Sequence, residues 1–455
     1  MKGMTLRAMT QAVNGIYHGN GEDYDKEITA ITIDSRKVTE GGLFIAIKGE
    51  RSDGHDFIGQ CFEKGAACVI SEKELPDEER SYIQVESSLQ ALKDLALLYR
   101  NNLDVKVVGI TGSVGKTSTK ETISSVLSEK YRVLKTLGNF NNEIGLPLTV
   151  FRLTEDDEVA VLEMGISDFG EMDRLSKIAQ PDICVITNIG FCHLENLGTR
   201  DGILKAKTEI FNHMNPDGIV IVNGDDDKLS TISQVHGKRP LVFGISNKDG
   251  VYADNIKSLG LDGTSFTIHG IKTSDNYSTF DLTVPVPGHH MVYNAMAAAL
   301  VGSVLGLSSI EIERGVKNLK TIAGRNNIIK ENGFTIIDDC YNANPVSMKA
   351  SLDVLDTAIG RKVAILGSMF ELGENEKQMH YDVGMYLGTK DIDVLITAGD
   401  LAAQIAAGTR AYIDTNYNAH GCEVHDFETR DDMLKCIGPV SYTHLRAHET
   451  GRNLV

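Results

Sequence analysis

The spacing of apolar and polar positions changes several times along the chain, and each change predicts a new element. Residues 105–110, VKVVGI, form a short β-branched run bounded by glycine, which is typical of a buried strand. Apolar residues then recur at helical spacing from Ile123 to Tyr131, which predicts a helix. The segment GSVGKT joins the two, so the predicted order is strand, glycine-rich loop and helix.

Strand and helix patterns alternate through the following residues, as a parallel sheet with covering helices requires. Residues 251–285 interrupt this order with alternating polar and apolar positions, which predicts an antiparallel insertion. Residues 287–307 are rich in small side chains and predict a long, closely packed helix. Further strands are predicted at 158–162, 183–186, 219–222, 240–243, 334–337, 362–366 and 394–397.

The residues before position 104 have shorter apolar runs. They predict two short strands around Gly41-Gly42, a helix through Phe62 entered by a turn at Asp53, and an amphipathic helix at 89–99. A second change of pattern follows near Gly324. We therefore predict an α/β protein of three domains: a small mixed α/β domain at 1–103, a central parallel-sheet domain at 104–323 and a further α/β domain at 324–455.

Composition narrows the class of protein. The 455 residues include 45 Lys and Arg against 63 Asp and Glu, and this net charge of −18 argues against a large nucleic-acid surface. No apolar run approaches the ~18 residues that a membrane span needs, and the N-terminus lacks the apolar core of a signal peptide. The seven cysteines are scattered and form no C-x-x-C pair, which disfavours a disulfide framework or a zinc site. We expect a cytoplasmic enzyme.

The loop after the first central strand has the chemistry of a phosphate-binding loop. Gly112 and Gly115 let backbone N–H groups turn toward phosphate oxygens at the start of a helix. Lys116 supplies a positive charge for the outer phosphates, and the Thr117 hydroxyl is placed to bind Mg²⁺. The strict form of this motif has glycine where this chain has Ile110, and the alternative is a chance glycine turn before a helix. We predict a nucleoside triphosphate site.

Two further side chains fall at the carboxyl ends of predicted strands, where ligands bind in open α/β sheets. Glu163 ends one strand and His193 follows another, so both share the rim of Lys116, and a carboxylate there commonly binds Mg²⁺. The alternatives are an exposed strand terminus for Glu163 and a structural role for His193. Lys207 has the spacing of an ordinary solvated helix lysine, and the segment Asp34-Ser35-Arg36 is equally compatible with a solvated strand end.

Motifs over residues 28 to 437 resemble the Mur ligases, which are ATP-dependent amide-forming enzymes of peptidoglycan precursor synthesis. The resemblance implies an N-terminal domain for a UDP-linked substrate, a central ATPase and a C-terminal Rossmann-like domain. The motifs GNFNNEIGLP, YNANP and LGSMFELG imply the member that adds D-alanyl-D-alanine to UDP-N-acetylmuramoyl-tripeptide through an acyl phosphate. They are accompanied by IDSRKVTEGGLFIAIKGERSDGHDFI, GITGSVGKTSTKE, LEMG, TNIGFCHLENLGT, KAKTEIF, GHHMVYNAMAAA and DDCYNANPVSM.

The resemblance also implies roles for individual residues, with ATP and Mg²⁺ as cofactors and a monomer as the working form. Lys207 aligns with a lysine that is carbamoylated in relatives, and catalysis would involve Lys116, Lys207, His193 and Arg325. The UDP-linked substrate would contact Ser35, Arg36, Asn141 and Asn142, and the metal would contact Thr117, Glu163 and His193. ATP would contact Gly112, Ser113, Val114, Gly115, Lys116, Thr117, Ser118, Asn294 (adenine), Arg325 (γ-phosphate) and Asp338 (ribose).

Two departures from the family pattern and three alternatives stay open at this point. The adenine-binding helix begins His289-His290 where relatives have His-Asn, and after Ile437 the family's valine-rich strand is replaced by GPVSYTHLRAHETGRNLV, which we expect to be non-native and poorly ordered. One alternative is the Mur ligase that adds the third amino acid, although its DNPR-type motif is missing from this sequence. The others are an enzyme similar to folylpolyglutamate synthase and a nucleotide-gated binding or switch protein.

Overall fold

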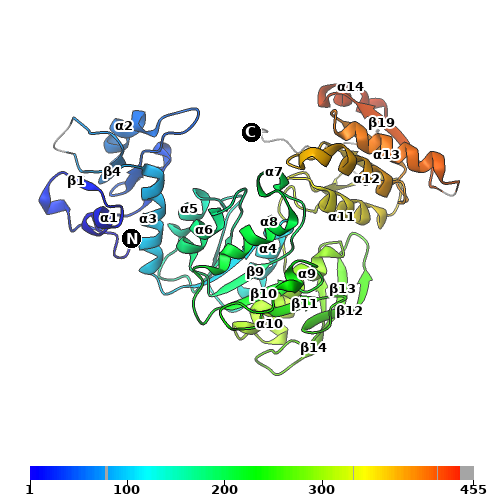
Figure 1. Ribbon diagram of the computed structural model, residues 1–455, viewed down its shortest axis with the longest axis horizontal. Helices are drawn as coiled ribbons and strands as arrows, with labels where there is room; N and C mark the ends of the chain where they lie inside the picture. Colours follow the sequence, from blue (N-terminus) through cyan, green and yellow to red (C-terminus); the bar gives the residue numbers. More distant parts are fainter. Residues whose placement is uncertain (77–79, 332, 418, 441–455) are drawn as a thin grey trace. The chain divides into compact units, whose positions relative to one another are not determined.

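The computed structural model describes residues 1–76, 80–331, 333–417 and 419–440 (Figure 1). Packing divides the chain into two units. The first comprises residues 1–111, 131–184 and 208–219, and the second comprises residues 112–130, 185–207 and those from 220 onward. This division does not test the domain boundaries predicted near residues 103 and 323, which stay predictions.

The first unit begins with a five-stranded sheet in the order β1-β5-β4-β3-β2. Strands β2 and β3 are the two short strands predicted around Gly41-Gly42. They pair in parallel because their connection contains the 3₁₀ helix η2 (Ser35–Lys37) and is too long for a hairpin. The strands are β1 Ile16–His18, β2 Ile31–Thr32, β3 Leu43–Ile45, β4 Cys68–Ser71 and β5 Tyr82–Gln84; the helices are α1 Leu6–Ala12, η1 Gly21–Asp23, η3 Gly54–Phe57, α2 Ile58–Glu63 and α3 Ser88–Asn101.

The same unit also contains strands of the larger, nine-stranded sheet. Strand β6 (Lys106–Thr111) is the predicted strand before the phosphate loop, and it pairs in parallel with β8 (Val159–Glu163). Every residue of β8 is buried, as expected for a parallel strand that is covered on both faces. The remaining elements are β7 Val133–Lys135, α5 Gly145–Val150, α6 Glu171–Ala179 and η4 Glu209–Phe211.

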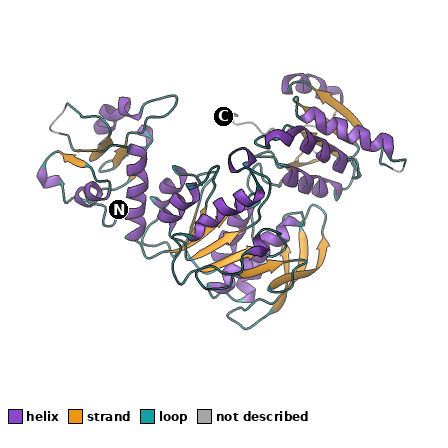
Figure 2. Ribbon diagram, viewed as in Figure 1, coloured by secondary structure: helices purple, strands orange, loops and turns teal. Residues whose placement is uncertain are grey.

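The nine-stranded sheet has the order β14-β13-β12-β11-β10-β9-β6-β8-β7. The parallel strand β9 occupies Ile183–Ile186, as predicted. Residues 251–284 form the predicted antiparallel meander β12-β13-β14, whose orange arrows are visible in Figure 2. The strands of this part are β10 Ile219–Asn223, β11 Leu241–Gly244, β12 Val251–Ser258, β13 Thr264–His269 and β14 Thr279–Val284.

Helix α9 (His290–Val304) is the predicted helix of small residues. Its residues from Met291 to Gly302 are buried apart from Tyr293, because alanines on several faces let neighbouring elements approach closely. Helix α10 (Ser309–Lys317) follows, and the capping box of Ser308 and Glu311 fixes where it begins. The other helices here are α4 Lys116–Leu127, α7 Leu194–Leu197, α8 Arg200–Thr208 and η5 Leu229–Thr231.

The region after Gly324 has two separate sheets. Strand β16 (Phe334–Asp338), predicted as the first strand of this α/β region, pairs antiparallel with β15 (Asn327–Glu331) instead of joining the parallel sheet β17-β18-β19. The short connection containing Gly333 explains this, because parallel strands need a longer crossover. The other elements are α11 Pro345–Asp356, β17 Val363–Leu366, η6 Gly373–Asn375, α12 Glu376–Leu387, β18 Val394–Ala398, α13 Ala402–Thr415, β19 Glu423–Phe427 and α14 Arg430–Val440.

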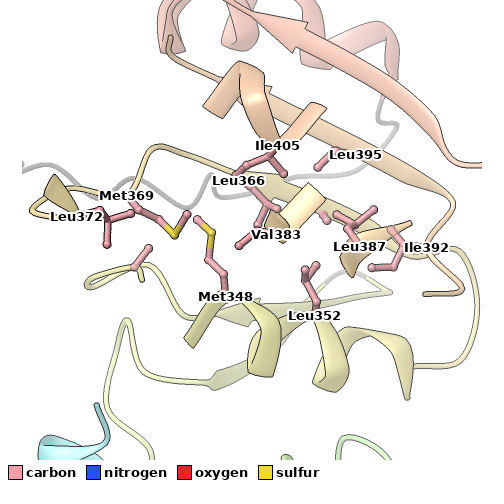
Figure 3. Packing of buried hydrophobic residues seen from close by; sticks show 12 residues of the cluster. Met348, Leu352, Leu366, Met369, Leu372, Val383, Leu387, Ile392, Leu395 and Ile405 are labelled. Atoms are coloured by element: carbon pink, nitrogen blue, oxygen red, sulfur yellow. The ribbon is translucent and has the colours of Figure 1, made fainter. Parts of the chain in front are cut away.

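This region has its own hydrophobic core between its helices and its parallel sheet (Figure 3). Met348 and Leu352 point from α11 toward Val383 and Leu387 of α12. Each fully buried side chain of this size contributes roughly 1.5–3 kcal/mol to folding. Figure 3 also labels the other core residues Leu366, Met369, Leu372, Ile392, Leu395 and Ile405.

The prediction about the sequence after Ile437 falls mainly on residues 441–455, which lie outside the described residues. In the part of the chain that the structure describes, none of the helices is both long and apolar enough to cross a membrane.

Candidate active site

The phosphate loop joins β6 to α4 as predicted. Gly112 has φ +149°, and Gly115 has φ +82° and stands directly before the first residue of α4. A side chain at Gly112 is excluded by space as well, because a Cβ there would lie 2.0 Å from Thr187 Oγ1. Both glycines are therefore required by the backbone, as a phosphate-binding loop demands.

Lys116 is the first residue of helix α4, and its side chain is half-buried and not freely exposed on the loop. Its Nζ atom donates to Gly112 O at 2.8 Å, which holds the ammonium group over the loop. Thr117 is buried and Ser118 half-buried in the same first turn. The loop thus places a cation and a hydroxyl beside its backbone.

Lys207 is buried, with only 1% of its surface exposed, so the interpretation as a solvated helix lysine is wrong. Burial, together with the charge of Lys116 and against the opposing effect of Cys192, lowers the pKa of Lys207 to about 7. One local feature of the sequence could have indicated this burial. Lys207 lies four residues after Ile203, so the two share a face of α8, and Ile203 is also fully buried.

His193 lies in the left-handed backbone region, with φ 59°, immediately before α7. Its Nδ1 atom is 2.8 Å from Glu371 Oε2, and Glu371 also has a positive φ of 62°. Burial lowers the pKa of His193, the Glu371 carboxylate opposes this shift, and the charges of Lys207 and Lys116 add to it. The structure therefore brings His193, Lys116 and Lys207 near one another. It also adds the Glu371 carboxylate, which was not predicted from the sequence.

Asn294 lies beside the phosphate loop. It is buried on α9, and its Oδ1 atom accepts a hydrogen bond from Thr119 Oγ1 at 2.9 Å. A Cβ atom at Gly115 would lie 3.6 Å from the same oxygen. The departure at His289-His290 therefore leaves Asn294 next to the loop, since α9 begins at His290 and carries it one turn later.

Arg325 and Asp338 both lie in the segment that opens the last region, where each contacts a different neighbour. The guanidinium of Arg325 stacks on the Tyr341 ring, 4.2 Å from its centroid. Asp338 is buried and accepts hydrogen bonds from Gly324 N at 2.8 Å and Cys340 Sγ at 3.0 Å. Asp338 therefore anchors the residue before Arg325 in this structure.

In the first unit, Glu163 and Asn141 form a pair. Glu163 ends β8 with only 2% of its surface exposed, so the interpretation as an exposed strand terminus is wrong. Asn141 Nδ2 donates to Glu163 Oε1 at 2.8 Å. The side chain of the neighbouring Asn142 is used differently, because its Oδ1 accepts from Gly145 N at the start of α5. The carboxylate is thus held in place from the loop predicted to contact substrate.

The segment Asp34-Ser35-Arg36 lies at the first unit's N-terminal sheet. Ser35 begins η2, and Arg36 is exposed and pairs with Asp34 at 2.9 Å. The Arg36 guanidinium is the main reason why the pKa of Asp34 is lowered to about 2. This geometry fits a solvated strand end and a substrate contact equally well.

The predicted Mg²⁺ site combines a hydroxyl, a carboxylate and an imidazole, from Thr117, Glu163 and His193. Among the described residues, no group of three or more His, Cys, Asp and Glu side chains is arranged to hold a metal ion. Mg²⁺ does not require such a group, because it commonly takes one or two protein oxygens and completes its shell with water and phosphate oxygens. The Thr117 hydroxyl and the buried Glu163 carboxylate are donors of that kind.

Comparison with known proteins assigns family domains to most of the chain. The model of the Mur ligase middle domain matches residues 110–302, and that of the Mur ligase glutamate ligase domain matches residues 324–440. A third model, described as Mur ligase family catalytic domain, matches residues 27–100.

Individual relatives are similar over nearly their full length. UDP-N-acetylmuramoyl-tripeptide–D-alanyl-D-alanine ligase of Bacillus subtilis is 40% identical, over 93% of this chain and 91% of its own. The crystal structure of MurF from Acinetobacter baumannii is 32% identical with a TM-score of 0.82, covering 96% and 98% of the two chains. MurF from Thermotoga maritima, solved in complex with ADP, is 31% identical with a TM-score of 0.75, covering 89% and 95%.

Proposed function

Because the chain belongs to the Mur ligase family, we propose that it joins D-alanyl-D-alanine to UDP-N-acetylmuramoyl-tripeptide and converts ATP to ADP and phosphate. The observation that carries this proposal is the similarity to tripeptide–D-alanyl-D-alanine ligases over about nine-tenths of both chains. ATP use has the further support of the similar structure that was solved with ADP.

The reaction needs ATP because a carboxylate is a poor electrophile at neutral pH. An oxygen of the tripeptide carboxylate attacks the γ-phosphorus of ATP, which forms an acyl phosphate and releases ADP. The amine of D-alanyl-D-alanine then attacks the acyl carbon, loses a proton and expels inorganic phosphate. The work of the protein is to position the reactants and to stabilise the charge that moves onto phosphate oxygens.

The negative charge on the phosphate oxygens would be stabilised by Lys116 and Arg325. Lys116 would exchange its contact with Gly112 O for a phosphate oxygen, and Arg325 would approach the γ-phosphate. Asn294 is proposed to contact adenine, and its position next to Gly115 supports this role. Asp338 is proposed to contact the ribose. The carboxylate that now accepts from Gly324 N would then also accept from a ribose hydroxyl, or would give up the bond to Gly324.

Lys207 is proposed to act as a carbamate. Its pKa of about 7 leaves much of the amine neutral near neutral pH, and only a neutral amine reacts with CO₂. The product is an anionic carbamate with release of one proton. This anion would replace one of two mutually repelling cations, Lys116 and Lys207, by an opposite charge.

A bound Mg²⁺ would neutralise part of the charge on the phosphate oxygens. Thr117, Glu163 and His193 are the side chains proposed to hold it, directly or through water. The buried Glu163 carboxylate fits this role, because Asn141 already donates to one of its oxygens and fixes its orientation.

The first unit is proposed to recognise the UDP-linked substrate, through Ser35, Arg36, Asn141 and Asn142. We propose domain boundaries at 103/104 and 323/324, a monomeric working form and action in the cytoplasm. The boundaries rest on the changes of sequence pattern and the location on composition, whereas the substrate contacts follow from the family resemblance.

One assay tests the proposal. Purified protein with ATP and Mg²⁺ should release ADP in the presence of UDP-N-acetylmuramoyl-tripeptide and D-alanyl-D-alanine, and mass spectrometry should show the pentapeptide product. Omitting the dipeptide should reduce turnover to the background rate. Product formation from UDP-N-acetylmuramoyl-dipeptide and a free amino acid would instead assign the third-residue ligase, and ADP release that ignores both substrates would favour a nucleotide-gated switch.

A further inference from the structure

The segment Thr187 to Gly190 follows strand β9 and lies directly against the phosphate loop. Asn188 binds both backbone groups of one loop residue: its Oδ1 atom accepts from Val114 N and its Nδ2 atom donates to Val114 O, each at 2.9 Å. Thr187 Oγ1 donates to the same Val114 O at 2.7 Å. A carbonyl oxygen has two lone pairs, so the two donors saturate it.

The contact extends to the neighbouring loop residue. Ser113 N donates to Asn188 O at 3.0 Å, and Gly190 N donates to Ser113 Oγ at 2.8 Å. The N–H groups of Ser113 and Val114 are therefore both engaged with Asn188. The approach is so close that only glycine fits at position 112, beside Thr187 Oγ1.

The Thr187–Gly190 segment is itself held from its other side. Ile189 N donates to Asp226 Oδ2 at 2.8 Å, and Ile189 O accepts from Arg200 Nη2 at 2.8 Å. Arg200 Nη1 in turn donates to Asp227 Oδ2 at 2.9 Å. Both backbone groups of the residue after Asn188 are thus fixed, so the segment is a rigid support for the loop.

We propose that Thr187 and Asn188 are positioning residues that hold the phosphate loop in its nucleotide-binding shape, and that Ser113 and Val114 contribute no backbone donor to the phosphates. This inference rests on the proposed use of ATP. Loss of the Thr187 or Asn188 contacts should therefore weaken nucleotide binding more when the nucleotide carries more phosphates. Only the phosphate loop would be disturbed, whereas the proposed adenine contact of Asn294 would stay intact.

The test is calorimetric titration of the full chain with ADP and with AMP, in the presence of Mg²⁺. Thr187→Val keeps the size of the side chain and removes the donor, whereas Thr187→Ser keeps the hydroxyl. We expect Thr187→Val and Asn188→Leu to lower ADP affinity about 10- to 100-fold, with a smaller loss for AMP. Thr187→Ser should stay within about threefold of the parent chain.

Two controls separate this role from a general loss of structure. Asn102→Leu removes a similar bond, from Asn102 Nδ2 to Lys2 O at 3.1 Å, in the other unit, and should leave ADP affinity unchanged. Binding of UDP-N-acetylmuramoyl-tripeptide should be unchanged in every variant.

Several outcomes would overturn the inference. Equal ADP affinity in Thr187→Val and the parent chain would do so, as would equal losses for ADP, AMP and the UDP-linked substrate. If Asn188→Leu does not fold, the Thr187→Val and Thr187→Ser pair decides. A parent chain that binds no ADP would contradict the proposed function itself, which is a different result.

Discussion

The surroundings of the phosphate loop and the Asp34-Ser35-Arg36 segment both contain basic side chains with proposed functional roles, but these side chains differ in how far they are buried. Near the loop, Lys207 is buried and Lys116 is half-buried against its own backbone. In the other segment the Arg36 side chain is 86% exposed and has Asp34 as its partner. Burial changes the chemistry of a basic group, whereas exposure leaves it ordinary.

This difference has a consequence for mutation. A side chain such as Lys207, whose pKa is displaced by its surroundings, should affect both reaction rate and stability when it is replaced. A solvated side chain such as Arg36 should affect only the binding of its ligand.

Lys116→Ala should reduce turnover by about 10³-fold or more, because it removes a cation that stabilises charge on the transferred phosphoryl group. The measurement is the rate of ADP release with both substrates present. Binding of UDP-N-acetylmuramoyl-tripeptide should be retained, which shows that the fold is intact. A variant with near-normal ADP release would falsify the role of the loop in the reaction.

Lys207→Ala should reduce turnover by about 100-fold or more if the carbamate organises the site, because its charge is then lost. A small carboxylate such as acetate should restore part of the rate by occupying the vacated space. Lys207→Arg, which keeps a cation and cannot form a carbamate, is the matched variant and should not be rescued. A ¹³C carbamate signal from the parent chain in ¹³C-labelled bicarbonate is the direct observation, and full activity in Lys207→Ala would exclude the role.

Replacing Lys207 by Met should also change how stability depends on pH. The folded pKa of about 7 lies below the ordinary value of 10.5, so between these values the unfolded chain binds one more proton than the folded chain. The contribution of Lys207 to the free energy of unfolding therefore rises with pH across this window, by at most about 1.4 kcal/mol per unit. Below pH 7 both states are protonated, and the cost of burying the charge is fully present.

The measurement is denaturant unfolding of the parent chain and Lys207→Met in CO₂-free buffer between pH 6 and 10. We expect Lys207→Met to be the more stable of the two at pH 6, with the gap closing as pH rises. A gap that does not depend on pH would mean that Lys207 is not titrating in the folded chain.

The sequence predicted the regular elements well because their signals are local. Strand β9 has the predicted bounds, the meander from Val251 follows the predicted alternation of polar and apolar residues, and helix α9 follows the prediction from its small side chains. The pairing of β16 with β15 was missed, since a single strand pattern does not specify its partner or its sheet. The three family domain matches agree with the predicted three-domain class.

The site was predictable only in part, for a physical reason. Gly112, Gly115 and Lys116 act within one short segment, and their spacing carries the signal. The depth of Lys207 depends on how α8 packs, and the pairing of His193 with Glu371 joins residues far apart in the chain. Such contacts arise from tertiary packing, which periodicity does not encode.

The smallest expected effect is that of replacing Arg36, because this side chain is exposed. Arg36→Ala should raise the KM for UDP-N-acetylmuramoyl-tripeptide by about tenfold, because a charge-assisted hydrogen bond to the substrate would be lost, while kcat stays unchanged. Arg7→Ala is the matched control, since Arg7 pairs with Asp25 at 2.7 Å on the same unit and is also exposed. Neither variant should measurably change the free energy of unfolding, because exposed ion pairs contribute little. An unchanged KM in Arg36→Ala would leave this arginine as the end of a solvated strand, and a similar rise in Arg7→Ala would mean that general positive charge on the unit, and not Arg36, attracts the substrate.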